Sequence, residues 1–174
     1  MELLLGAGAR PERRVRWAGH DGWTHCVRVD HSAAHRPDVV CDLEFPPYPF
    51  QSDSVDEIHA YEVFEHLGDQ GDWRAFFAQF AECWRLLKPG GLLVGTCPTP
   101  DSPWAWGDPS HRRLISRESL TFLNQAAYTA QVGVTAMTDF RPWYQADFEP
   151  LALHTQADVF TFVLQAVKPA RVAA

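Results

Sequence analysis

The sequence has no apolar run long enough to cross a bilayer, few cysteines and no excess of basic residues. No run approaches the ~20 apolar residues of a membrane span, and the start MELLLGAGARPERR has too short a hydrophobic core for a signal peptide. The 174 residues carry 15 Lys and Arg against 22 Asp and Glu, a net charge of −7. General nucleic-acid binding needs a cationic surface, so we expect neither this nor membrane binding.

Cysteine and histidine spacing gives no metal-binding pattern. The four cysteines are too far apart for a zinc ribbon or a redox motif, at Cys26, Cys41, Cys83 and Cys97. We expect them to be reduced and to pack as small apolar groups, which predicts a cytoplasmic protein. Only His31 and His35, among the early histidines, have helical spacing, and Pro37 follows closely. We therefore predict no metal site.

Short apolar segments alternate with turns in the first hundred residues. Between the later segments, apolar residues recur at steps of three and four over 72–87, which predicts an amphipathic helix. Strands that alternate with helical or loop crossovers favour an α/β fold, a doubly wound Rossmann-like sheet that is mostly parallel. The strands predicted for this sheet cover residues 3–5, 25–30, 38–41, 57–61 and 92–97.

The second half of the chain has a different pattern. Residues 98–115 are rich in Pro and Trp without a clear period, which predicts a long loop, and a capping signature at Ser116 begins a predicted helix over 116–128. The β-rich segments 148–155 and 159–167 are separated by three residues, so we expect a C-terminal antiparallel β-hairpin. Since no repeat or change in composition divides the chain, residues 1–174 are predicted to form a single domain.

Glycines and acids after successive strands indicate a nucleotide site. Gly6 and Gly8 follow the first strand, where glycine lets the backbone approach a ligand closely. Asp30 lies 22 residues after Gly8 (30 − 8), near the ~20 expected of a ribose-binding carboxylate. Asp42 ends the third strand and can accept from the amine of an adenine, with Leu43 packed on the ring. Ordinary turn acids are the alternative for both aspartates.

Several motifs together resemble class I S-adenosylmethionine-dependent methyltransferases. They are LLLGAGAR, VRVDHS, DVVCDLEFPPYPFQSDSVDEIHAYEVFEHL and CWRLLKPGGLLVGTCP, within residues 1–97. The resemblance implies S-adenosylmethionine as cofactor. By position, the resemblance places Gly6, Ala7 and Gly8 beside the methionine and ribose of the cofactor. It places Asp30 on the ribose with His31 beside the adenine, and Asp42 with Leu43 at the adenine edge. Tyr61 and Glu62, at the end of the fourth strand, would lie beneath the sulfonium.

The sequence departs from the family pattern in three places. Arg10 stands where the family has a third glycine, and Leu4 stands where it has an acid. The crossover from Gly8 to His25 is too short and polar for a full helix, and no helix precedes the first strand, so the usual N-terminal helical cover is missing. A methyl-transfer site must exclude water. We expect residues 98–147 to cover the site or bind the acceptor, or a second subunit in a homo-oligomer to close the open side.

Methyl transfer requires alignment and, for a hydroxyl acceptor, a base. The candidate catalytic residues are His66, in EHL, and His111, in DPSHRR, with structural hydrogen bonding as the alternative for each. The expected reaction is methyl transfer to a small-molecule acceptor. A noncatalytic binding module of the same fold is one alternative. A nicotinamide-dependent oxidoreductase is another, although its GxGxxG motif needs glycine where Pro11 stands.

Overall fold

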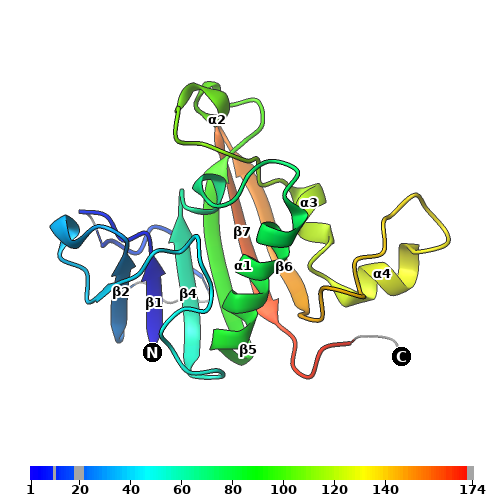
Figure 1. The fold of residues 1–174 in the computed structure, drawn as a ribbon, viewed down its shortest axis with the longest axis horizontal. Coiled ribbons are helices and arrows are strands. Elements are labelled where there is room, and N and C mark those ends of the chain that lie inside the picture. Colours follow the sequence, from blue (N-terminus) through cyan, green and yellow to red (C-terminus); the bar gives the residue numbers. More distant parts are fainter. Residues whose placement is uncertain (10, 18–21, 172–174) are drawn as a thin grey trace.

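One seven-stranded sheet organises the molecule. The computed structural model describes residues 1–9, 11–17 and 22–171, so Arg10 lies outside the described residues. The strand order is β3-β2-β1-β4-β5-β7-β6 (Figure 1), and all pairs are parallel except the two that involve β7. The predicted fold class, a mostly parallel sheet with an antiparallel C-terminal hairpin, is confirmed. The strands are β1 (Glu2–Leu5), β2 (Cys26–Asp30), β3 (Val39–Val40), β4 (Val55–Tyr61), β5 (Leu87–Pro98), β6 (Phe148–Gln156) and β7 (Val159–Ala166).

The helices are few and mostly short. The long predicted helix is confirmed as α1 (Trp73–Leu86), and the Asp72 carboxylate caps it by accepting from Ala75 N. The others are α2 (Pro103–Gly107), α3 (Arg117–Thr121), α4 (Gln125–Gln131) and the 3-10 helices η1 (Ala33–His35) and η2 (Phe64–His66). No helix in the described part of the chain is long and apolar enough to span a membrane.

Two local predictions were wrong. The single helix predicted over 116–128 is divided into α3 and α4, because the Asn124 side chain accepts from Ala127 N and begins a new helix. The segment predicted as a loop over 98–115 contains α2, which is capped by Ser102 and has Pro103 in its first turn. The capping pattern predicted at Ser116 is confirmed as a capping box with Ser119.

The two faces of the sheet are covered differently. Successive side chains of a strand point to opposite faces, so Leu3 and Leu5 join the main core while Leu4 faces the other side. The main core packs the sheet against α1 and α3, and Figure 1 shows α1 in front of the strands. On the rear face, no helix of the described residues contributes to the apolar cluster around Leu4. Segments 11–17 and 22–24, which contain no helix, as predicted for this crossover, cover it through Val15, Trp17 and Trp23.

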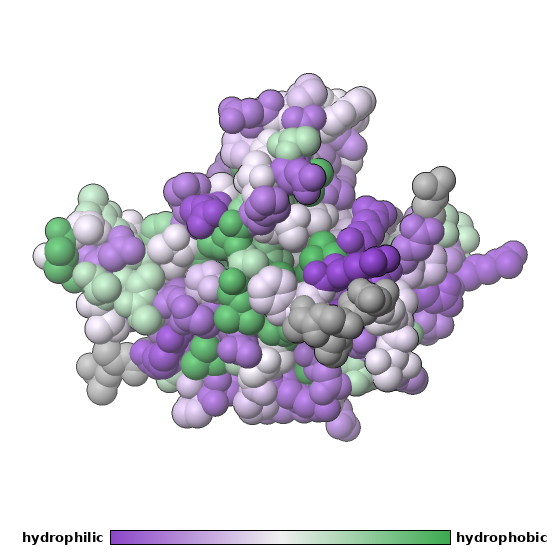
Figure 2. Space-filling model, turned by 180° about the vertical axis from the view of Figure 1, so that it is seen from behind, coloured by the Kyte–Doolittle hydropathy of each residue, from purple (hydrophilic) through white to green (hydrophobic). Residues whose placement is uncertain are grey.

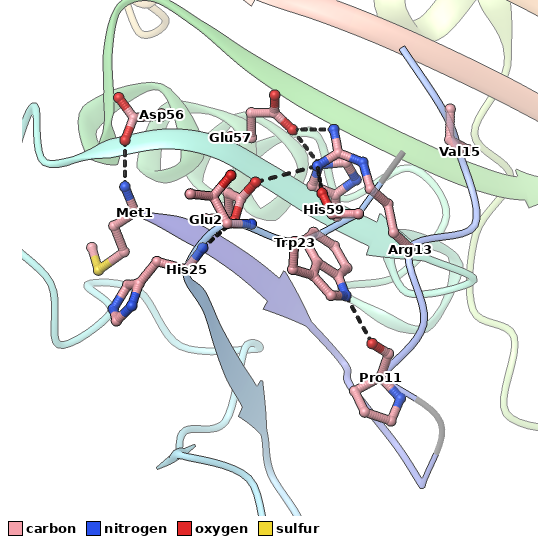
Figure 3. A network of polar contacts seen from close by, with 12 residues as sticks. Met1, Glu2, Pro11, Arg13, Val15, Trp23, His25, Asp56, Glu57 and His59 are labelled. Carbon is pink, nitrogen blue, oxygen red and sulfur yellow. Dashed lines mark hydrogen bonds and ion pairs between the residues drawn. The ribbon is translucent and has the colours of Figure 1, made fainter. Parts of the chain in front are cut away.

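A polar network fixes this covering segment to the rear face (Figure 3). The Arg13 side chain is only 2% exposed and pairs with Glu2 and Glu57, which stand on β1 and β4. His59 Nε2 lies 2.8 Å from Glu57 Oε2, and its Nδ1 lies 2.7 Å from Tyr61 Oη. In Figure 2 the face seen from behind shows apolar patches between hydrophilic side chains. Buried ion pairs thus hold a segment that has little apolar surface of its own.

Candidate functional site

The glycine turn after β1 closes over the carboxyl end of β2. Gly6 and Gly8 have φ angles of 60° and 53°, the left-handed region that favours glycine. A Cβ at Gly6 would lie 2.6 Å from Val63 Cγ2, whereas a Cβ at Gly8 would meet no atom of the described residues within 4 Å. Ala7, between them, is buried and donates its N–H to Val29 O. The turn is therefore packed against the segment after β4 at Gly6 and open at Gly8.

Asp30 lies under this turn and is 3% exposed. Its carboxylate accepts from Gly8 N and Ser32 N, each at 2.8 Å, and lies 3.2 Å from His35 Nδ1. Burial alone would raise the pKa of Asp30, but these hydrogen bonds outweigh it and lower the pKa. The side chain is therefore an ionised acceptor at neutral pH, with lone pairs left for a ligand.

The remaining predicted adenosine contacts lie close to Asp30 along the sheet edge. Val40 pairs with Asp30 in the sheet, so Asp42 follows on the neighbouring strand end. Asp42 is exposed and one of its oxygens accepts from Glu44 N at 3.0 Å, whereas Leu43 is 6% exposed and packs in the main core. The side chain of His31 is 76% exposed beside Asp30. The edge thus carries an anionic and largely open surface beyond the glycine turn.

Tyr61 and Glu62 lie at the end of β4, as predicted, but face different surroundings. Tyr61 is 6% exposed, and its hydroxyl accepts from Val15 N at 3.3 Å within the rear network. Glu62 has a φ of 55°, a conformation that non-glycine residues rarely adopt outside functional or strained sites. Its N–H donates to Thr96 O at 2.9 Å. The backbone therefore turns sharply at Glu62 and enters η2.

The structure brings the two predicted catalytic histidines into contact. The rings of His66, at the end of η2, and His111, in the loop before α3, have centroids 4.6 Å apart in an edge-on arrangement. Ser110 directly precedes His111. Its hydroxyl and its carbonyl oxygen each lie 3.2 Å from His66 Nδ1. Burial lowers the pKa of His66, which favours the neutral imidazole.

Glu65, which the sequence analysis did not single out, lies beside this pair. It is 2% exposed, and neither carboxylate oxygen has a hydrogen-bond partner among the described residues. Burial, reinforced by the nearby charge of Glu62, raises the pKa of Glu65 to about 8. The sequence signal was the acid directly before His66 in EHL, but only the fold shows that this acid points inward.

The segment 98–147 contributes both covering and core residues. Figure 1 shows α2 beyond the carboxyl ends of the parallel strands, on the same side as the glycine turn. Trp104 and Trp106 of α2 are 66% and 64% exposed, whereas Tyr144 is buried against Phe77 of α1. A cavity of about 200 Å³ lies away from the edge, between the start of α1 and α3. The exposed tryptophans therefore stand at the end of the sheet where a ligand would bind.

Comparison with known proteins identifies the family. A family model described as a methyltransferase domain matches residues 6–95, which include the glycine turn, both strand-end aspartates and η2. The chain belongs to the class I S-adenosylmethionine-dependent methyltransferases. A protein of Mycolicibacterium smegmatis described as a "Probable S-adenosylmethionine-dependent methyltransferase" is 35% identical over 124 residues, which are 66% of this chain and 43% of that protein. The chain thus spans less than half the length of this curated relative.

Solved methyltransferases share the fold. A SAM-dependent methyltransferase from Archaeoglobus fulgidus aligns with a TM-score of 0.58 and 15% identity, covering 94% of this chain and 85% of that one. One from Aquifex aeolicus aligns with a TM-score of 0.56 and 12% identity, covering 95% and 81%. At such identities the likeness concerns the arrangement of strands and helices alone.

Proposed function

We propose that this methyltransferase domain binds S-adenosylmethionine at the edge formed by the glycine turn, Asp30 and Asp42, and transfers its methyl group to a small-molecule acceptor. The observation that carries the proposal is the glycine turn itself, where Gly8 N donates to the ionised carboxylate of Asp30 and a Cβ at Gly8 would meet no atom of the described residues within 4 Å. Family membership favours this cofactor over a nicotinamide.

The described residues fit the adenosine part of the cofactor. A Cβ at Gly8 would meet no atom within 4 Å among residues 1–9, 11–17 and 22–171, which leaves room for a ligand beside this part of the backbone. Asp30 is held in place by two backbone N–H groups and can accept from ribose hydroxyls, and Asp42, beside it, can accept from the adenine amine with His31 next to the ring. Hydrogen bonds with one charged partner contribute roughly 1.5–3 kcal/mol each. Leu43 would support the adenine edge from the core side.

The acceptor end is assigned to the segment after β4. The bound cofactor supplies an electrophilic methyl group, which joins a lone pair of the acceptor while the electron pair of the broken carbon–sulfur bond stays on sulfur. Glu62 begins the turn there, and Val63 contacts the glycine turn, so η2 follows the methyl end of the site directly. His66 and His111 would receive the proton that a hydroxyl acceptor releases. The exposed tryptophans of α2 would limit water access.

Binding of S-adenosylhomocysteine, measured by calorimetry, tests the cofactor site. We expect saturable binding that Asp30→Asn weakens at least tenfold, because amide replacement removes the charge from the hydrogen bonds. The matched control is Asp56→Asn, which changes an exposed acid that follows the first residue of β4, at the opposite end of the strands. Circular dichroism checks that both variants fold. Absence of binding at millimolar ligand would exclude the proposed site.

A second measurement separates the enzyme from a noncatalytic module. Release of S-adenosylhomocysteine from S-adenosylmethionine is followed with a panel of small hydroxyl, amine and thiol acceptors. Turnover with any of them supports the enzyme. Tight cofactor binding without turnover across the whole panel favours the binding module instead.

A further inference from the structure

Three potential metal ligands converge beside the acceptor end. One ligand atom from each of Glu65, His66 and His111 lies within 4.8 Å of the others. Two of these residues are adjacent in η2, and the third comes from the loop before α3, 45 residues later (111 − 66). The arrangement is held by the backbone, since Arg112 N and Arg113 N both donate to Glu65 O, at 2.8 and 3.1 Å.

Two of the three side chains are buried with unsatisfied polar atoms. Glu65 is 2% exposed, and both its oxygens lack a hydrogen bond of regular geometry in the described part of the chain, where Glu62 and the Cys97 thiol are their polar neighbours. The side chain of His111 is 8% exposed, and its Nδ1 likewise has no such partner. Buried polar groups in folded proteins are nearly always satisfied, so exceptions that point at one another require an explanation. A bound cation would take one ligand atom from each of the three residues at once.

Neighbouring side chains orient the ligands in the way metal sites require. Ser110 approaches His66 Nδ1 and donates from its hydroxyl to Asp108 Oδ1 at 2.6 Å. The other carboxylate oxygen of Asp108 lies 3.9 Å from His111 Nε2. Carboxylates and carbonyls that contact the second ring nitrogen fix the orientation of metal-binding histidines. His66 thus has a partner on Nδ1 and leaves Nε2 for an ion, while His111 has Asp108 only within ion-pair distance of Nε2 and leaves Nδ1 without a partner among the described residues.

We propose that Glu65, His66 and His111 bind a divalent transition-metal ion. Two imidazoles and one carboxylate suit ions such as Mn²⁺, Fe²⁺, Co²⁺ or Zn²⁺, whereas Mg²⁺ and Ca²⁺ prefer oxygen ligands. Three protein ligands on one side leave coordination positions open for a substrate. The sequence analysis predicted no metal site, because only His31 and His35 among the early histidines have helical spacing. The site proposed here uses two other histidines.

The position of the site suggests its role, which rests on the proposed methyl transfer. Val63, which contacts the glycine turn at Gly6, is followed directly by η2 and its ligands. An ion there would bind an oxygen of the acceptor and lower the pKa of its hydroxyl group, so that the hydroxyl passes its proton to solvent water near neutral pH while the two histidines serve as ligands in place of proton acceptors. His66 and His111 would then act through the ion, and the acceptor would belong to the alcohols or phenols.

Titration of the metal-free chain with Co²⁺ tests the site without turnover. We expect one equivalent to bind, seen as visible d–d absorption and by calorimetry. Glu65→Gln and His111→Ala should each weaken binding by about a hundredfold, in line with the loss of one ligand. His154→Ala removes an exposed histidine of β6 and should leave the affinity unchanged. Binding that is absent in the intact chain, or equal in the ligand variants and the control, would overturn the proposal.

S-adenosylhomocysteine binding by the same variants separates this proposal from the function on which its role rests. Glu65→Gln nearly preserves size and shape, and its folding is checked by circular dichroism. Loss of Co²⁺ binding with retained S-adenosylhomocysteine binding supports a distinct metal site. If the intact chain binds Co²⁺ but not S-adenosylhomocysteine, the ion site stands while the proposed methyl transfer fails.

Discussion

Replacing Gly6 with alanine would test how closely the glycine turn depends on its contact with the segment after β4. Both Gly6 and Gly8 have positive φ angles, and this conformation costs a non-glycine residue about 1–2 kcal/mol. At Gly8 the added methyl group meets no atom within 4 Å in the part of the chain that the structure describes, so Gly8→Ala should lower the free energy of unfolding by only that amount. Gly8→Ala is therefore the matched control that measures backbone strain without the clash expected for Gly6→Ala.

At Gly6 the same methyl group would lie 2.6 Å from Val63 Cγ2. Valine is stiff at χ1 and Val63 is buried, so the clash is not relieved by a simple rotation. Overpacking of this kind costs about 1–3 kcal/mol, which brings the expected loss for Gly6→Ala to about 2–5 kcal/mol. Val63→Ala removes both Cγ atoms. The double variant should therefore recover the clash energy, a coupling of about 1–3 kcal/mol.

Urea denaturation measures these differences directly. With an m-value of about 2 kcal/mol/M, a loss of 2 kcal/mol shifts the midpoint by about 1 M. Calorimetry with S-adenosylhomocysteine then shows whether the displaced turn still binds the cofactor product. Equal losses for the two glycine variants, or no coupling between Gly6 and Val63, would refute the packing argument.

Three further perturbations test the surrounding fold. Asp72→Ala removes the cap of α1 and should cost about 1 kcal/mol in urea denaturation; an unchanged midpoint contradicts the capping role. Gly95→Ala would place a Cβ 2.1 Å from Phe162 Cζ and should broadly disrupt β5 and β7, seen as a large fall in the melting temperature; a near-neutral effect would show that this ring moves freely. Burial lowers the pKa of His59, so below pH ~6.5 the unfolded chain binds a proton at this histidine more readily than the folded chain does. The free energy of unfolding should therefore be highest above pH ~6.5 and should fall as the pH drops below that value. His59→Gln should flatten that decrease, and an unaltered pH profile would show that His59 is not its source.

The strands of the mostly parallel sheet and the C-terminal hairpin could be expected from the sequence because local signals and the family resemblance agree. Leu3–Leu5 is a short apolar run before glycine, and the apolar steps over 72–87 have helical period, so each element forms from its own residues. The start of β5 was missed because Lys88, Pro89 and two glycines usually end an element. Gly91 approaches β4 so closely that a Cβ would lie 3.0 Å from Asp56 O, and the strand continues through it.

Some residues of the candidate site could likewise be predicted from the sequence, whereas others could not. Asp30 was predictable because a strand-end acid at a known distance from a glycine turn is a local pattern, and the structure places it under Gly8 N. Glu65 was not predictable, because its burial depends on the loop that carries His111, 46 residues later (111 − 65). The inward direction of the Tyr61 hydroxyl depends on segment 11–17, which has no strong local preference of its own.

The rear network explains how the sheet tolerates a crossover without a helix. A covering helix would bury an apolar stripe, but segment 11–17 has few apolar residues, and charged groups occupy the sheet beneath it. Arg13 is 2% exposed between Glu2 and Glu57, and breaking a buried pair costs about 3–5 kcal/mol because one charge is left uncompensated. The same pairs fix the chain a few residues beyond Gly8. The glycine turn is thus held at β1 on one side and by Arg13 on the other, so the position of the turn depends on these buried charges.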